Sequence, residues 1–345
     1  MANYAASVLA EAQLILNERF AAPEKRLKSA GVFGAFRKNT ELAMPNVGAL
    51  RTKEERAEKA YFFNRAKRSV LTSRTHDHTG TVGDSTEVAL SWSTYGDKCQ
   101  TSLKRSDNNV FADAQILANE LENMFKNIYE GIDAASLTYL GTNKTTVNAA
   151  TKNGIFDTTR DAFEIATANI ARFLQYGSSM LRQNYYQGMY DAVLDPVLFL
   201  EAQHYLNQGA GNSTNTSYQN AMAEAIWEAV TLSDADYPNG AGYFIPSGTI
   251  GVVDWIPSQN RQGVGDFDSV LGGYGSIVDP ISGLTYAVHS YANRADTSAA
   301  GGDTQDVAQE WEISVDLSFN KSPLTAAGET TIFEVGVVDV PADAP

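Results

Sequence analysis

Two of the chain's four histidines lie two residues apart in "SRTHDHTG", with an aspartate between them. On an extended strand His76 and His78 would project from the same face, as strand-borne metal ligands do. A zinc site needs about three or four protein ligands, and the other histidines, His204 and His289, lie in segments without a companion motif. The pattern therefore favours polar residues at the end of a β-hairpin, and it leaves His76 and His78 as weak candidates for metal binding.

The sequence offers little other material for catalysis. The only cysteine, Cys99, excludes an internal disulfide and a cysteine cluster for zinc within one chain, and it is expected to be a packed thiol. There is no G-x-S-x-G elbow, no phosphate-binding G-x-x-x-x-G-K-[ST], no complete G-x-G-x-x-G and no H-E-x-x-H. We therefore predict that the chain has no catalytic residue, binds no cofactor and is not an enzyme. A hydrolase that uses dispersed carboxylates or the histidine pair stays open as an alternative.

Charge is distributed unevenly along the chain. The formal net charge is −15, which argues against the whole chain enclosing a polyanion. Residues 1–74, however, carry 14 of the 26 basic side chains against seven acidic ones. No acid interrupts the basic residues Arg65, Lys67, Arg68 and Arg74. Such a segment could contact its own acidic body, a neighbouring copy or DNA.

Composition indicates a folded protein, because 43% of the residues are apolar and 19% are charged. The first twenty residues have no basic stretch before their apolar residues, and two glutamates interrupt them. They predict an amphipathic helix rather than a signal peptide or a membrane span, so no membrane partner is expected.

The first hundred residues predict three further segments. Residues 31–50 have scattered Gly, Pro and Asn without a sustained period, which indicates an extended arm. A charged helix is expected from Arg51 to about Lys67. The β-branched and aromatic runs that follow flank a Gly-rich stretch, which predicts a long hairpin with its turn near Gly80 to Asp84.

From Phe111 the apolar residues change to a helical period. Steps of three and four residues keep one apolar stripe in line: Leu117, Leu121, Met124, Ile128, Ile132, Ala135 and Tyr139. This predicts a helix of about thirty residues, roughly 45 Å long, that ends near Gly141.

The remainder alternates between helices and strands. Helices are expected over Thr159 to about Arg182, over "PVLFLEAQHYLNQG" after an Asp195 cap, and over Tyr218 to about Val230. Strands are expected at "GMYDAVLDP", "GTIGVVDWIP" and "LTYAVHSY". "WEISVDLSF" alternates as a half-buried antiparallel strand, and "TTIFEVGVV" is expected to be its partner.

These parts occur in an order that resembles a known family. An arm, a long hairpin, a rod-like helix ending in "IDAASLTYLGTNKT", an inserted α/β region and C-terminal return strands are similar to a major capsid protein of tailed bacteriophages. "HTGTVGDSTEVALSW", "AVLDPVLF", "GTIGVVDWIP" and the closing "SIVDPISGLTYAVHSYANRADTSAAGGDTQDVAQEWEISVDLSFN" resemble capsid proteins of phages that infect Bacteroidetes-type hosts. The resemblance covers nearly the whole chain.

The resemblance implies an α+β fold of the Hong Kong 97-like shell type. It implies these segments: 1–45 an N-terminal arm, 46–65 a charged helical connector, 66–105 an extended hairpin loop, 106–155 a peripheral domain with a spine helix, 156–300 an axial domain, and 301–345 return strands of the peripheral domain and a C-terminal tail. The hairpin loop would lie over an adjacent subunit. The candidate subunit contacts are therefore Arg65, Lys67, Arg68, Arg74, His76 and His78.

The implied function is self-assembly into the icosahedral shell around a double-stranded DNA phage genome. The implied partners are copies of the chain in pentamers and hexamers, a portal, and separate scaffolding or decoration proteins, with packaged DNA touched only non-specifically. The implied location is the virion, after assembly in the host bacterial cytoplasm. The alternative within the same fold is an encapsulin-like compartment that houses an enzyme, and a β-rich surface adhesin is a third, poorer interpretation.

Overall fold

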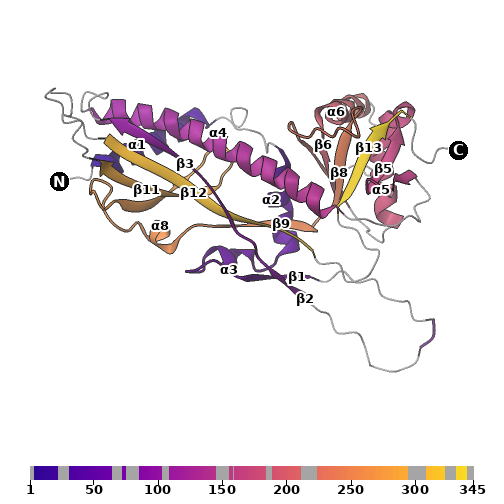
Figure 1. The fold of residues 1–345 in the computed structure, drawn as a ribbon, viewed down its shortest axis with the longest axis horizontal. Coiled ribbons are helices and arrows are strands. Elements are labelled where there is room, and N and C mark those ends of the chain that lie inside the picture. Colours follow the sequence, from indigo (N-terminus) through magenta and orange to yellow (C-terminus); the bar gives the residue numbers. More distant parts are fainter. Residues whose placement is uncertain are drawn as a thin grey trace.

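A 34-residue helix, α4 (Val110–Asn143), runs along the elongated molecule in the computed structural model (Figure 1). At 1.5 Å per residue it extends for about 50 Å. The structure describes residues 4–21, 31–63, 72–74, 85–102, 109–144, 155–157, 159–183, 189–210, 224–293, 308–322 and 332–339. Over these ranges, none of the helices combines the length and the apolar character that crossing a membrane requires.

The predicted long helix and its apolar stripe are confirmed. The buried apolar side chains of α4 are Ala114, Leu117, Ala118, Leu121, Met124, Phe125, Ile128, Tyr129, Ile132 and Leu140. The helix begins after Asn109, whose side-chain Oδ1 accepts the backbone N–H of Phe111 at 3.0 Å. It continues past the predicted end at Gly141, because that glycine does not take the left-handed conformation that ends many helices.

Helix α4 lies against a five-stranded antiparallel sheet, which we call the long sheet. Its strands are β3 (Ser93–Ser102), β9 (Ile250–Trp255), β10 (Gly273–Val278), β11 (Thr285–Asn293) and β12 (Ala308–Lys321). Strand β12 pairs with β3 along one edge, and along the other edge with β11 and then β9, since Asp316 and Leu317 pair with both β3 and β9. The odd-numbered side chains of β12 from Trp311 to Leu317 are buried in the core beneath α4, as predicted, but the expected exposed face ends at Asp316, which is also buried.

Helix α1 (Tyr4–Arg19) packs along α4 and completes this core. The predicted amphipathic helix is confirmed, since Val8, Ala12 and Leu16 are fully buried. The first turn of α1 is capped from far along the chain: the Asp268 carboxylate accepts the backbone N–H of Tyr4 at 2.6 Å.

The arm predicted for residues 31–50 is wrong, because residues 31–43 form a helix, α2 (Gly31–Ala43). Its first turn is fixed by Asp133 of α4, whose carboxylate accepts the backbone N–H of Phe33 at 3.1 Å. Gly31 has φ +79°, and a Cβ there would lie 2.2 Å from the same carboxylate. The scattered glycines hid a helix, because here glycine makes room for close tertiary contacts.

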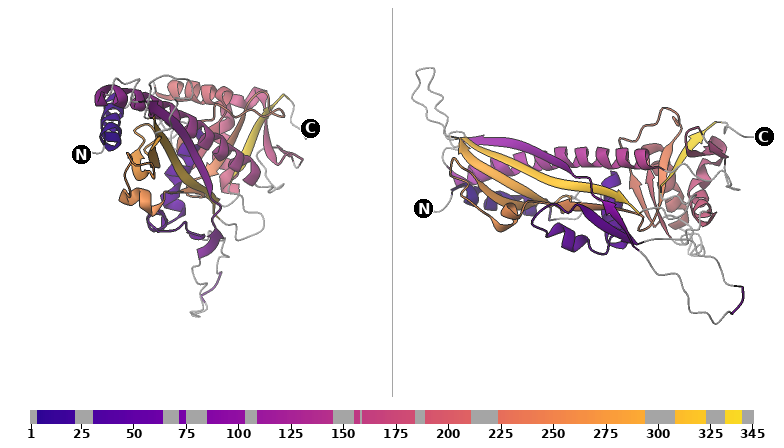
Figure 2. Two further views of the ribbon diagram at one scale, coloured as in Figure 1. Left: turned by 60° about the vertical axis from the view of Figure 1, so that its left-hand side comes forward. Right: turned by 60° about the horizontal axis from the view of Figure 1, so that its bottom comes forward.

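A six-stranded mixed sheet, the second sheet, lies beyond the C-terminal end of α4 (Figures 1 and 2). Its strands, in spatial order, are β4 (Ile155–Asp157), β5 (Ala162–Ala166), β13 (Phe333–Val338), β8 (Ala241–Pro246), β6 (Tyr190–Leu194) and β7 (Ala225–Glu228). It shares a separate apolar core with the short 3₁₀ helix η2 (Thr167–Arg172) and with α5 (Phe173–Gln183) and α6 (Pro196–Ala210). The predicted strand and capped helix are confirmed here, and the Asp195 carboxylate accepts the backbone N–H of Leu198 at 2.8 Å.

Three predictions fail in this region. The helix expected from Thr159 begins only at Phe173, because β5 pairs in parallel with β13. Where the third helix was predicted, the residues that the structure describes form a strand instead, β7, which pairs in parallel with β6. Strand β13 is not the partner of β12, since it lies in the second sheet between β5 and β8. Each error concerns pairing between segments far apart in sequence.

The charged helix expected from Arg51 to Lys67 is also wrong. A short helix, α3 (Val47–Arg51), ends where it should begin, and β1 (Lys59–Phe63) follows. Strand β1 pairs antiparallel with β2 (Ser85–Ala89) as a separate two-stranded ribbon. The long hairpin therefore has a different first strand, and β3 belongs to the long sheet. A one-turn helix, α8 (Ser258–Gln262), packs on β10.

Candidate functional site

The ribbon β1–β2 joins the body through a small apolar cluster of its own. Ala60 and Phe62 are fully buried there with side chains of α3 and β9, whereas Tyr61 between them is 50% exposed. The indole Nε1 of Trp92, just after the ribbon, donates to the backbone carbonyl of Ala57 at 2.8 Å. The base of the ribbon is thus fixed, and the chain leaves and re-enters it at the facing residues Phe63 and Ser85.

Most of the predicted subunit contacts belong to the segment that this base carries. Arg74 is the member of the set that falls within the described ranges, and it is exposed. The others lie outside the described residues and stay predictions: Arg65, Lys67, Arg68, His76 and His78. The turn predicted near residues 80–84 also lies outside them.

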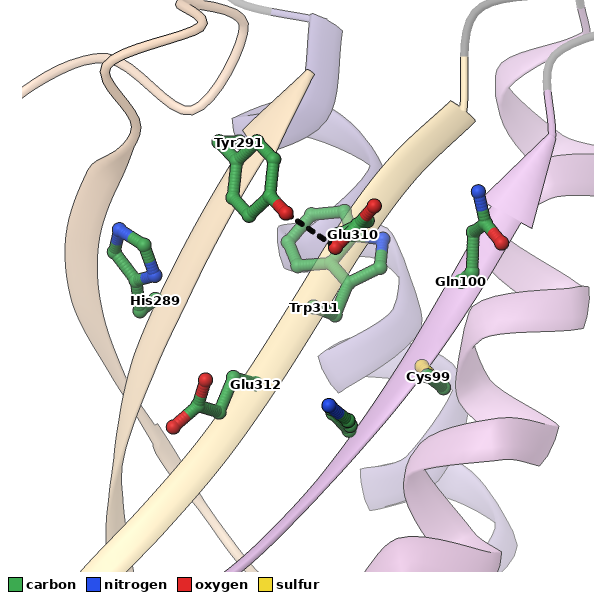
Figure 3. Close-up of a pocket in the computed structure, with 8 residues that line it drawn as sticks. Cys99, Gln100, His289, Tyr291, Glu310, Trp311 and Glu312 are labelled. Atoms are coloured by element: carbon green, nitrogen blue, oxygen red, sulfur yellow. Dashed lines mark hydrogen bonds between the residues drawn. The ribbon is translucent and has the colours of Figure 1, made fainter. Parts of the chain in front are cut away.

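A second exposed surface is the outer face of the long sheet, on the side away from α4 (Figure 3). The register of β11, β12 and β3 brings polar side chains together in two adjacent rows, which are His289 with Glu312 and Lys98, and Tyr291 with Glu310 and Gln100. With neighbouring residues they line a shallow cavity of about 380 Å³.

Glu310 is the best-fixed charge on this outer face. The Tyr291 hydroxyl donates to its Oε2, and the Asn293 amide donates to its Oε1 at 2.8 Å. These hydrogen bonds, that of Tyr291 first, hold the pKa of Glu310 below its usual range. The His289 ring lies 4.7 Å, between centroids, from the ring of Tyr274. The surface is therefore a negative, ring-bordered hollow that suits a cationic side chain.

Neither Glu310 nor Cys99 in this hollow is a free base or nucleophile. Both carboxylate oxygens of Glu310 already accept hydrogen bonds. Burial raises the pKa of the Cys99 thiol to about 12, so it stays protonated at neutral pH and is a poor nucleophile. Among the residues that the structure describes, no three His, Cys, Asp or Glu side chains are grouped so as to hold a metal ion.

The two remaining histidines are not brought together. His289 lies on the long sheet, and His204 is exposed on α6 beside the second sheet. The outer-face rows were missed at the sequence level because β3 contributes residues that lie about two hundred positions before those of β11 and β12. A signal was present, since β11 and β12 both alternate polar with apolar residues and Glu310 and Glu312 mark the polar face.

The structure is similar to solved phage capsid structures over most of its length. The capsid structure of the cyanophage P-SCSP1u shares 11% identity over 89% of this chain and 90% of that chain, with a TM-score of 0.43. The cyanophage Pam1 capsid asymmetric unit shares 9% identity over 91% and 93%, with a TM-score of 0.42. The capsid of Ralstonia phage GP4 shares 9% identity over 84% and 86%, with a TM-score of 0.41. No protein-family model and no curated protein sequence matches the chain. All three are structures of phage capsids.

Proposed function

We propose that the chain is a major capsid protein, which assembles with copies of itself into an icosahedral shell around a double-stranded DNA phage genome. The observation that carries the proposal is the ribbon β1–β2. Its base is anchored by Phe62, yet within the described chain it pairs with no third strand. A two-stranded hairpin is marginally stable by itself in water, so a contact with another copy would complete it.

Charge supports contact between copies. The segment between β1 and β2 contains the basic residues Arg65, Lys67, Arg68 and Arg74, of which Arg74 lies within the described residues and is exposed, and the outer face of the long sheet carries Glu310, whose pKa is lowered. Opposite charges on two surfaces of one chain steer copies together and disfavour other pairings. Because the two surfaces differ, the contact would be head-to-tail, the type that closes into rings.

The partners and location follow from this role. We propose pentamers and hexamers as building units, a portal and separate scaffolding or decoration proteins as further partners, and only non-specific contact with DNA. The chain would be a virion component without catalytic activity, assembled in the host cytoplasm. The roles of segments 1–45, 46–65, 66–105, 106–155, 156–300 and 301–345 that the resemblance implies stay predictions.

A shortened ribbon tests the proposal. Because Phe63 faces Ser85 across the ribbon, residues 64–84 can be replaced by the two-residue turn Asn-Gly without changing the register. We expect this variant to unfold cooperatively at nearly the native temperature and to form no large particles in size-exclusion chromatography and electron microscopy.

A second variant distinguishes the effect of the length of the segment from the effect of its side chains. Replacement of residues 64–84 by a Gly/Ser linker of equal length keeps the reach of the segment but removes its side chains. We expect it to fail in assembly as well. Particles of native size from the shortened variant would show that the ribbon is not a subunit contact.

A further inference from the structure

Two lysines cross the junction between the long sheet and the second sheet. Lys38 of α2 lies 2.7 Å, Nζ to Oδ1, from Asp191 of β6. Lys144, directly after α4, forms an ion pair with Glu334 of β13. In each pair the lysine is just over a quarter exposed, whereas Asp191 is 0% and Glu334 3% exposed. Each cation thus comes from the side of the long sheet and each buried anion from the second sheet.

Helix α2 is itself fixed to the long sheet. The hydroxyl of Thr40 accepts the backbone N–H of Val252 in β9 at 3.0 Å. On the same helix, the rings of Phe33 and Phe36 pack edge-on against Phe319 of β12. Lys38 and its neighbour therefore reach the second sheet from a helix that cannot move independently of the long sheet.

The next residue of α2 binds both the anion and the chain crossing beside it. The Asn39 amide donates to Asp191 Oδ2 at 2.5 Å, and its carbonyl oxygen accepts the backbone N–H of Gly248 at 2.6 Å. Gly248 has φ +75° and lies in the turn from Pro246 to Thr249, where the chain passes from β8 to β9. This is the crossing between the two sheets that the described residues include in full.

Lys38 is also linked, through Glu224, to the Pro246–Thr249 turn. Lys38 Nζ also lies 3.3 Å from Glu224 Oε2, and the Ser247 hydroxyl donates to that carboxylate at 2.6 Å. Around the second pair, Lys144 donates to the backbone carbonyl of Arg160 at 2.8 Å, and the Tyr243 hydroxyl donates to Glu334 at 3.0 Å. Both pairs are therefore parts of hydrogen-bonded networks.

Buried ion pairs add little net stability, because desolvation offsets their attraction, and their best-attested use is to fix one arrangement among several. We propose that Lys38–Asp191 and Lys144–Glu334 form a two-point clamp that sets the angle between the long sheet and the second sheet, with the Pro246–Thr249 turn as the joint. When these ion pairs are broken, the second sheet can take more than one orientation relative to the long sheet. This inference goes beyond the proposed shell function and does not depend on it.

The test measures the angle on the dilute, unassembled chain. Spin labels on Gln100→Cys of β3 and Gln203→Cys of α6, both exposed, report the distance between the two sheets in a Cys99→Ser background. We expect one narrow distance distribution for the native clamp. Lys38→Met and Lys144→Met should each broaden and shift the distance distribution, and the double variant should broaden it further. Lys38→Arg keeps the positive charge and should give the narrow native distribution.

A matched control separates the clamp from a general loss of stability. Arg160, in the turn just before β5, pairs with Glu164 of β5, which is 1% exposed, so this ion pair does not cross the junction. Arg160→Met should lower the unfolding temperature and leave the distance distribution narrow. If the lysine variants keep the native distribution, the clamp is refuted.

A milder variant decides the matter if the Lys→Met proteins do not fold. Glu224 is 35% exposed, so Glu224→Gln weakens the Lys38 network without leaving a buried charge unpaired. We expect a smaller broadening from it, and an unchanged distribution would overturn the proposal. Because the measurement uses unassembled protein, a chain that never forms shells would refute the proposed function without affecting this result.

Discussion

Single aspartates hold the first turns of three helices. The carboxylates of Asp268, Asp133 and Asp195 accept backbone N–H groups of α1, α2 and α6, respectively. Asp195 is adjacent to its helix and was predicted from sequence. The other two caps come from residues 264 and 100 positions away. No local pattern reveals a cap supplied by tertiary structure, which is why α2 was missed.

Removal of the Asp133 carboxylate should cost stability. An unmet N–H at the start of a helix costs about 1 to 2 kcal/mol, so we expect Asp133→Ala to lower the free energy of unfolding by about that amount. Urea denaturation measures the change. Glu130→Ala, at an exposed position one turn away on α4, should change stability by less than about 0.5 kcal/mol. Equal effects from the two variants would refute the capping role.

Asp113 predicts an unusual dependence on pH. It is 2% exposed, and burial raises its pKa, although the neighbouring hydroxyl groups of Tyr4 and Thr101 oppose the rise. The folded chain therefore binds this proton at a higher pH than the unfolded chain does. The stability that the group contributes is present at low pH and falls as pH rises from its ordinary pKa through its raised one.

Asp113→Asn removes this titration. We expect the native chain to lose stability relative to the variant as the pH rises above about 4, the ordinary pKa of an aspartate. Denaturant titrations of both proteins at several pH values measure the difference, with Glu130→Gln as the exposed control. A difference that stays constant over this range would contradict the assigned burial of the charge.

At the scale of elements, local periodicity predicted those elements whose burial follows from one amphipathic face. Helix α4 and strands β11 and β12 belong to this group. Strands β5 and β7 were predicted as helix, because parallel pairing to distant strands overrides local propensity. The outer-face site depends on how β11, β12 and β3 pair with one another, and the alternation of residues within each strand does not predict that pairing.

The anchoring of the ribbon by Phe62 leads to a second prediction at the scale of elements. Phe62 is fully buried and Tyr61, its neighbour on the same strand, is 50% exposed. Phe62→Ala removes the largest side chain of the small cluster and should cost about 3 to 5 kcal/mol of local stability. In hydrogen exchange, we expect faster exchange of the β1 and β2 amides, with those of β11 and β12 unchanged.

Tyr61→Ala is the matched control, because the same strand loses a ring of similar size from its exposed side. It should leave exchange in the ribbon near the native rate. Uniformly faster exchange across both sheets in Phe62→Ala would show instead that the cluster supports the whole fold.

At the scale of the whole molecule, the chain consists of two sheets, whose junction contains both apolar contacts and ion pairs, and a ribbon anchored at one edge. The long sheet and α4 supply a stiff frame, and the second sheet has its own core. Arg74, in the segment between β1 and β2, is exposed, and the outer face of the long sheet carries Glu310. Such an arrangement suits a subunit that gains its remaining contacts from its neighbours.

The central claim is that copies of this chain build a closed shell. Size-exclusion chromatography of the purified native chain, with electron microscopy of each fraction, tests it most directly. We predict pentamers, hexamers or shells with icosahedral symmetry. A chain that stays a stable monomer at high concentration, with or without a scaffolding protein, would contradict the account.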